Sequence, residues 1–149
     1  MAVGGHHWAL WNSEVLIVKD LSVSLADRPG TGAKVTQVLA DAGMNIEGVC
    51  YFPHRGQTWG VVHVLLDDGE KGRDVIEATG FEVREVRDVI LVDGLMDRPG
   101  VLAALLEDFA DHGVNIDLLY MASKSRLVIG TEQMHEAREG VRTIEATFG

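Results

Sequence analysis

Cysteine is nearly absent from this chain, and long apolar runs are missing altogether. Cys50 is the only cysteine, which excludes an internal disulfide and a cysteine-rich metal site and fits a reducing compartment. No apolar run reaches the roughly 18–20 residues that a membrane helix needs. The first residues also lack the basic segment and apolar stretch of a signal peptide. We therefore expect a cytoplasmic protein with no membrane contact.

Positive charge is also scarce, and this narrows the range of partners. Lys and Arg number 13 against 23 Asp and Glu, a formal net charge of −10. Such a surface repels a phosphate backbone and anionic lipid headgroups, so we expect neither nucleic acid nor membrane as a partner. The six histidines show no spacing typical of a metal site, and no acid–base or nucleophile pattern stands out. We expect no metal, no cofactor, no catalytic residue and no enzymatic activity.

An internal repeat is the main feature that is present. Asp27-Arg28-Pro29-Gly30 recurs as Asp97-Arg98-Pro99-Gly100, an offset of 97 − 27 = 70 positions. The same offset relates Asn45-Ile46 to Asn115-Ile116, and no gap is needed from 21 to 47. A match of this regularity indicates a duplicated structural unit.

Each copy has the same order of structural signals. In the first copy Leu21, Val23 and Leu25 alternate with serines, which is the period of a half-buried strand. The Asp-Arg-Pro-Gly turn follows, then apolar residues at helical spacing. Two more strands, a short helix and a fourth strand from Phe81 complete the order βαββαβ. The second copy lacks its fourth strand, and we expect residues 8–18 to supply it, in the same chain or in a partner chain, because a bare strand edge needs cover.

These features resemble the ACT domain family. The residues that carry the resemblance are the Asp-Arg-Pro-Gly turn after an apolar strand, the amphipathic helix and the Gly-x-Asn-Ile step into the second strand, all present in both copies. The resemblance implies an α+β fold of two tandem ferredoxin-like βαββαβ (ACT) modules. The modules are expected to pair side by side into an eight-stranded antiparallel sheet with helices on one face. The predicted boundaries are an N-terminal arm over 1–14, a first module over 15–87 and a second module over 88–149.

The resemblance also implies a function. ACT domains often bind amino acids where two modules meet, and their usual role is feedback control of enzymes of amino-acid metabolism. We therefore predict a small-molecule-sensing regulatory protein, a homodimer, that binds an amino acid at the interface of its two modules and acts by allostery. The alternative is a ligand-free regulatory or interaction subunit of an amino-acid metabolic enzyme.

The resemblance places the ligand between the strand-to-helix turn of one copy and the second strand of the other. Elementary chemistry supports this, because a helix N-terminus offers N–H groups to a carboxylate. An aspartate can pair with an ammonium group, and an asparagine both donates and accepts hydrogen bonds. The predicted ligand-binding residues are Asp27, Arg28, Gly30, Thr31, Gly32, Asn45, Ile46, Asp97, Arg98, Gly100, Val101, Leu102, Asn115 and Ile116.

A structural role is an open alternative for several of these residues. The aspartates of the two turns can stabilise a helix start, and the asparagines can simply tolerate the turn that follows a glycine. The copies also differ, because Thr31 and Gly32 stand where the second copy has Val101 and Leu102. We therefore expect unequal sites, the first more open and the second a candidate for a structural role.

Overall fold

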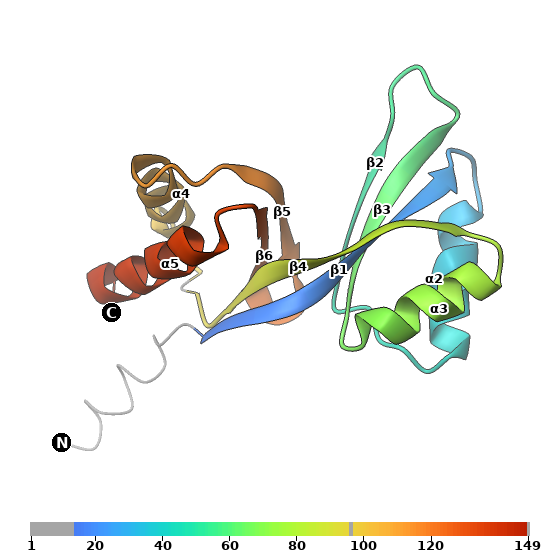
Figure 1. Ribbon diagram of the computed structural model, residues 1–149, viewed down its shortest axis with the longest axis horizontal. Helices are drawn as coiled ribbons and strands as arrows, with labels where there is room; N and C mark the ends of the chain where they lie inside the picture. Colours follow the sequence, from blue (N-terminus) through green and yellow to red (C-terminus); the bar gives the residue numbers. More distant parts are fainter. Residues whose placement is uncertain (1–13, 96, 149) are drawn as a thin grey trace. The chain divides into compact units, whose positions relative to one another are not determined.

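A computed structural model describes residues 14–95 and 97–148 of the chain (Figure 1). The elements in chain order are β1 (Glu14–Ala26), α2 (Thr31–Asp41), β2 (Gly48–Pro53), β3 (Trp59–Leu66), α3 (Gly69–Ala78), β4 (Glu82–Asp93), α4 (Val101–Asp111), β5 (Ile116–Ala122), the 3-10 helix η1 (Ser123–Ser125), β6 (Arg126–Thr131) and α5 (Met134–Phe148). No helix within these two ranges is long and apolar enough to cross a membrane.

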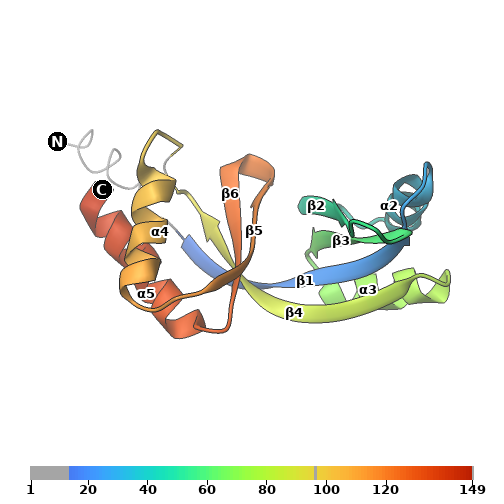
Figure 2. The ribbon, with the colours of Figure 1, turned by 90° about the horizontal axis from the view of Figure 1, so that it is seen from above.

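The chain divides into two compact units, and the divisions fall inside β1 and β4. Residues 18–88 form one unit, which we call the first unit. The second unit comprises the described residues 14–17, 89–95 and 97–148. β1 and β4 lie side by side as two long strands (Figure 2), and each has one part in either unit.

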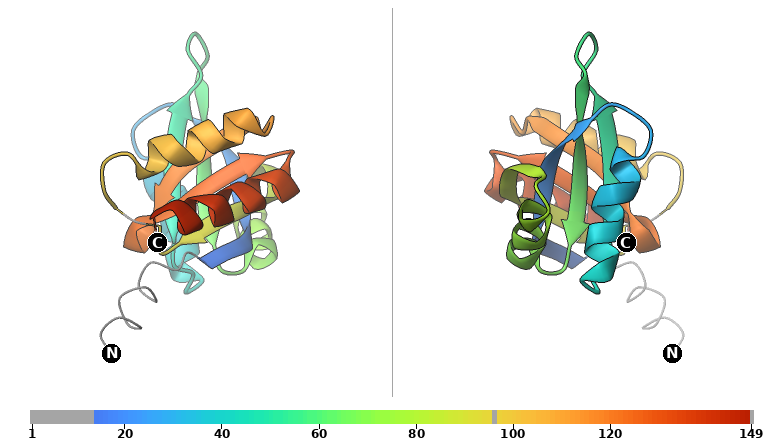
Figure 3. Two further views of the ribbon diagram at one scale, coloured as in Figure 1. Left: turned by 90° about the vertical axis from the view of Figure 1, so that its left-hand side faces the viewer. Right: turned by 90° about the vertical axis from the view of Figure 1, so that its right-hand side faces the viewer.

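The first unit has its strands in the order β4-β1-β3-β2. β3 pairs antiparallel with both β1 and β2, so that Val62 lies opposite Val23 on one side and Tyr51 on the other. α2 and α3 cover one face of this sheet (Figure 3, right). The core between them consists of the buried residues Leu21, Val23, Leu25, Val35, Leu39, Val62, Val64, Leu66 and Ile76.

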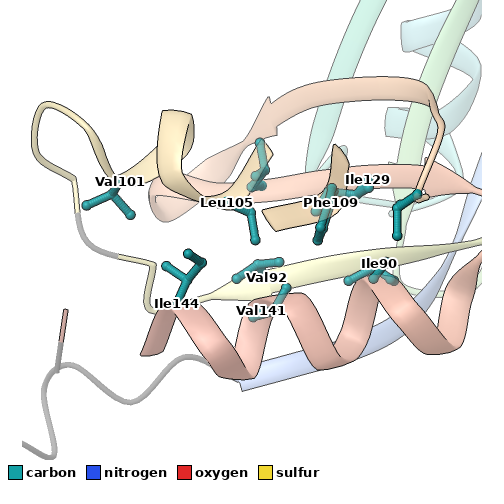
Figure 4. Close-up of a cluster of buried hydrophobic side chains, with 11 residues drawn as sticks. Ile90, Val92, Val101, Leu105, Phe109, Ile129, Val141 and Ile144 are labelled. Carbon is teal, nitrogen blue, oxygen red and sulfur yellow. The ribbon is translucent and has the colours of Figure 1, made fainter. Parts of the chain in front are cut away.

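The second unit repeats this arrangement in the order β1-β4-β6-β5. β6 pairs antiparallel with β4 and β5, and Ile129 lies opposite Ile90 and Leu119. α4 and α5 lie over this sheet and bury a core of their own (Figure 4). Its buried residues include Ile90, Val92, Leu105, Phe109, Ile129, Val141 and Ile144.

Two predicted features differ from the observed fold. Residues 14–95 and 97–148 form six strands, whereas eight were expected. The fourth strand of the first copy and the first strand of the second copy are one continuous strand, β4, and β1 likewise has one part in each unit. The physical reason is that no glycine or proline interrupts residues 81–93, so nothing ends the extended conformation between the copies.

The predicted edge strand over residues 8–18 is described only in part. Residues 8–13 lie outside the described residues, and 14–17 are the first part of β1, within the second unit. Val15 packs against the core of that unit. The predicted arm over residues 1–14 therefore lies almost wholly outside the described part of the chain.

The packing of Val15 can be tested with a matched pair of substitutions. Val15 contacts the core of the second unit, whereas Ile17, two residues later on the same strand, is 44% exposed. We expect Val15→Asp to lower the free energy of unfolding by about 1–3 kcal/mol and Ile17→Asp to change it by less than about 0.5 kcal/mol. Urea unfolding measures both. Equal losses in the free energy of unfolding from the two variants would show that Val15 does not pack against the core of the second unit.

Candidate functional site

A groove in the first unit brings several of the predicted ligand residues together. It has a volume of about 380 Å³, within the range of roughly 300–1,000 Å³ that is typical of small-ligand sites. α2 begins at this groove, and β1, β2 and β3 supply its other walls. The lining residues are Leu25, Asp27, Arg28, Thr31, Gly32, Val35, Thr36, Val49, Tyr51 and Val62.

The turn between β1 and α2 is held by backbone contacts. The Asp27 N–H donates to the Thr58 carbonyl at 2.9 Å, and the Thr31 hydroxyl donates to the Ala26 carbonyl at 2.7 Å. Gly30 closes the turn with a φ of 95°, a left-handed conformation that favours glycine. No side chain caps the N-terminus of α2, which leaves the first turn of that helix open to an anionic group.

A hydrogen bond across the groove fixes the carboxylate of Asp27. The Tyr51 hydroxyl on β2 donates to Asp27 Oδ1 at 2.9 Å. Removal of the phenol from water, the hydrogen bond to Asp27 and the negative charge of Asp27 together raise the pKa of Tyr51 above 10. The carboxylate of Asp27 therefore binds the second strand of its own copy and does not cap α2, and its role in ligand binding stays a prediction.

Gly60 on β3 gives the Tyr51 ring the space it occupies. A Cβ atom at residue 60 would lie 2.5 Å from the Tyr51 hydroxyl and 2.6 Å from the Phe52 carbonyl oxygen. Non-bonded atoms do not approach this closely in folded proteins. Any side chain at residue 60 would therefore displace the Tyr51 ring. The absence of a side chain at residue 60 is thus what allows Tyr51 to lie across β3 and reach Asp27.

Two opposite charges meet at the groove. Asp27 and Arg28 are adjacent in the chain, both are exposed, and both line the groove. Within the described residues the Arg28 guanidinium has no hydrogen bond or ion pair. An acid and an unpaired guanidinium at one small groove match the two charged groups of a zwitterion.

Some predicted residues of the first copy lie outside the groove lining. The exposed Asn45 side chain donates to Glu47 Oε1 at 2.8 Å. Ile46 packs against the core of the first unit. Gly30 shapes the turn through its backbone. Of the seven residues predicted in this copy, the structure therefore brings Asp27, Arg28, Thr31 and Gly32 to the groove.

The equivalent residues of the second copy have other surroundings. Val101 is 1% exposed and belongs to the core of the second unit, whereas Leu102 is 40% exposed. The Asn115 N–H donates to Gln133 Oε1 at 3.0 Å. Ile116 packs against the same core as Val101. Asp97, Arg98 and Gly100 are exposed in the turn before α4.

The two copies differ most in their hydroxyl groups. Adding 70 to Thr31, Thr36 and Tyr51 gives Val101, Leu106 and Met121, so each hydroxyl of the groove is replaced by an apolar side chain in the second copy. A tyrosine–aspartate hydrogen bond like that between Tyr51 and Asp27 is therefore impossible at the equivalent positions. This extends the inequality predicted from Thr31 and Gly32 alone.

Sequence reasoning missed the wall that β2 contributes. Val49 and Tyr51 lie on the same face of β2 because side chains alternate along a strand, and both line the groove. The strand itself was predicted, but which of its side chains face the groove was not. The residual exposure of these apolar side chains, 51% for Val49 and 40% for Tyr51, is visible only in three dimensions.

Cys50 is the one cysteine of the chain, and it lies on β2 near His63 and Asp20. Cys50 and Ser22 lie opposite His63 in the sheet, and His63 Nδ1 is 2.8 Å from the buried Asp20 Oδ2. Burial and the negative charge of Asp20 raise the pKa of the Cys50 thiol to about 11, so this thiol is protonated at neutral pH and is a poor nucleophile. Among the described residues, no group of His, Cys, Asp and Glu is placed to hold a metal ion.

The strand order and the groove define an α+β protein with a ferredoxin-like fold of the ACT type. The family model described as ACT domain matches residues 89–139. This match confirms, over residues 89–139, the resemblance to the ACT domain family seen in the sequence. The first copy is related to this stretch by the gapless offset of 70 and by the same order of strands.

Solved structures with the same fold cover almost the whole chain. A protein from Bacteroides thetaiotaomicron has 24% identity and a TM-score of 0.73 over 87% of this chain and 89% of its own. Regulatory subunits of aspartate kinase from Thermus thermophilus and Thermus flavus have 19% and 21% identity, with TM-scores of 0.68 and 0.69 over 92% of this chain and 97% of theirs. These TM-scores establish a shared fold. No curated protein sequence gives a significant match.

The role of Gly60 predicts opposite effects of two glycine substitutions. Gly60→Ala places a Cβ against Tyr51 and a backbone carbonyl, and we expect a loss of about 1–3 kcal/mol in the free energy of unfolding. Gly32→Ala is the control, because no atom lies within 4 Å of its Cβ position in α2, and it should stabilise by about 0.4–1 kcal/mol. Urea unfolding compares them. A Gly60→Ala variant as stable as the parent would mean that the Tyr51 ring does not lie across residue 60.

The hydrogen bond to Asp27 predicts a late ionisation of Tyr51. In the folded protein the pKa of Tyr51 is raised above its ordinary value of 10. The stabilisation from its hydrogen bond to Asp27 is therefore present below pH 10 and is lost as the pH rises through the raised pKa. We expect Asp27→Asn to lower the pKa of Tyr51 toward its ordinary value, and Asp97→Asn to leave it unchanged. Phenolate absorbance follows the titration, and Tyr51→Phe identifies the transition. Identical curves for parent and Asp27→Asn would contradict the assignment.

Proposed function

We propose that this chain is a regulatory protein that senses an amino acid in the groove of its first unit, instead of at the interface of two modules as predicted from the sequence, and that it catalyses no reaction itself. The single observation that carries the proposal is the juxtaposition of Asp27, held by Tyr51, and the unpaired Arg28 at a groove of about 380 Å³. This pair of opposite charges offers one partner to each end of a zwitterion.

The geometry suggests a distinct role for each group. Asp27 Oδ1 accepts from Tyr51, and its second carboxylate oxygen is then the acceptor for a ligand ammonium group. Arg28 and the uncapped first turn of α2 would hold the carboxylate, since guanidinium groups and helix N-termini both favour anions. The ligand side chain would then lie against Val49, Tyr51 and the other apolar residues that line the groove.

The comparisons support a regulatory role through family and fold. The ACT domain match over residues 89–139 and the fold shared with regulatory subunits of aspartate kinase favour a chain that works with an enzyme of amino-acid metabolism. A bound amino acid would act by preferring one arrangement of the protein over another. A homodimer is the predicted assembly, in the cytoplasm.

The second copy is proposed to have a structural rather than a binding role. Its turn has the same Asp-Arg-Pro-Gly residues, but Val101 is buried in the core and the hydroxyl groups of the groove are replaced by apolar side chains. Sensing by the first unit alone would explain why only one of the copies retains the tyrosine–aspartate pair.

The proposal predicts ligand-dependent stabilisation that depends on one of the two equivalent aspartates. In a thermal-shift screen of the twenty amino acids, a ligand at 100 times its dissociation constant should stabilise the chain by about 2.7 kcal/mol. Asp27→Asn removes the charge that faces the ligand ammonium, and we expect at least a tenfold loss of affinity. Asp97→Asn is the matched control in the second copy and should leave the affinity unchanged.

Two outcomes would contradict this proposal. A shift lost in Asp97→Asn and kept in Asp27→Asn would transfer the site to the second copy. No shift with any amino acid, together with co-purification of an enzyme, would favour the alternative of an interaction subunit that binds no ligand.

A further inference from the structure

We infer that the groove of the first unit selects an amino acid with an uncharged, apolar side chain of the size of valine or leucine. The inference rests on the proposed function, because it assumes that a zwitterion occupies this groove. It concerns the side chain of the ligand, which Asp27 and Arg28 do not hold.

The first argument is the composition of the groove walls. Four of the ten lining residues are aliphatic and come from four different elements: Leu25 on β1, Val35 on α2, Val49 on β2 and Val62 on β3. The Tyr51 ring adds a fifth apolar surface. Leu25, Val35 and Val62 are at most 5% exposed, so they form a rigid floor rather than a surface that can rearrange around a polar group.

The second argument is that every hydroxyl proton in the lining already has an acceptor. Thr31 donates to the Ala26 carbonyl at 2.7 Å, and Thr36 donates to the Gly32 carbonyl at 2.9 Å. Tyr51 donates to Asp27 at 2.9 Å. A hydroxyl has a single proton to donate, so none of these three groups can donate to a polar ligand side chain without breaking a bond within the protein.

The third argument concerns charge. Asp27 is the only carboxylic acid and Arg28 the only basic residue among the ten lining residues, and the ammonium and carboxylate of the ligand use both. A lysine, glutamate or aspartate side chain would bring a third charge into the groove without a partner. Burying an unpaired charge is costly, whereas an aliphatic side chain gains from contact with the floor.

The experiment compares ligands of equal shape and different polarity on the full-length chain. Valine and threonine differ by a methyl in place of a hydroxyl, and leucine and asparagine have similar branching. Titration calorimetry should give a valine affinity up to about 100-fold above that of threonine, which is the discrimination an apolar pocket reaches against an added hydroxyl. Leucine should exceed asparagine by more, because an amide leaves more unpaired polar atoms.

A pair of variants tests whether the groove wall is responsible. Val49→Thr keeps the branched shape on β2 and adds a hydroxyl to the wall, so we expect the preference for valine over threonine to narrow. Leu119→Thr changes the equivalent residue of β5, 70 positions later, and should leave the preference as it is in the parent. Circular dichroism and urea unfolding check that both variants remain folded.

The outcomes separate this inference from the proposed function. Tighter binding of the apolar member of each pair, weakened by Val49→Thr alone, supports the inference. Equal or tighter binding of threonine, asparagine or lysine, lost in Asp27→Asn, overturns the inference and leaves the proposed function standing. A preference that Leu119→Thr alone narrows also overturns it, and binding of no amino acid overturns the proposed function itself.

Discussion

Two long strands carry the apolar residues on which both hydrophobic cores depend. β1 contributes Val15 to one core and Leu21, Val23 and Leu25 to the other, and β4 is divided between the units in the same way. A unit of about 70 residues buries a limited share of its surface and is marginal alone. A continuous strand gives each unit the fourth strand it needs without an additional chain break or turn.

The candidate site depends on a few contacts between the turn and the sheet of the first unit. The Asp27 N–H binds the hairpin between β2 and β3 through Thr58, while its carboxylate binds Tyr51. Gly60 supplies the space for the tyrosine ring, and Gly30 supplies the left-handed turn that starts α2. The two glycines act differently, since one is required by its backbone angle and the other by the atoms around it.

The two copies share the conformation of their turns and differ in the side chains that follow them. The backbone conformation of the two turns is nearly the same, with φ of 95° at Gly30 and 94° at Gly100. The side chains that follow have diverged, from the hydroxyl groups of Thr31 and Thr36 to the apolar Val101 and Leu106. The turn requires a left-handed glycine in both copies, whereas the side chains that line the groove of the first unit are not required by the fold.

The sequence by itself determined the repeat, the family, the order of strands and helices and the turn at Asp27 to Gly30, because these depend on local periodicity and turn chemistry. Only the tertiary structure decided that β4 is one strand, that Tyr51 reaches Asp27 across Gly60, and that Asn45 turns instead to Glu47. These contacts join residues that are distant in the chain or compete for one partner. Local sequence patterns do not specify which of these contacts forms, because that depends on how the strands and the helix pack against each other.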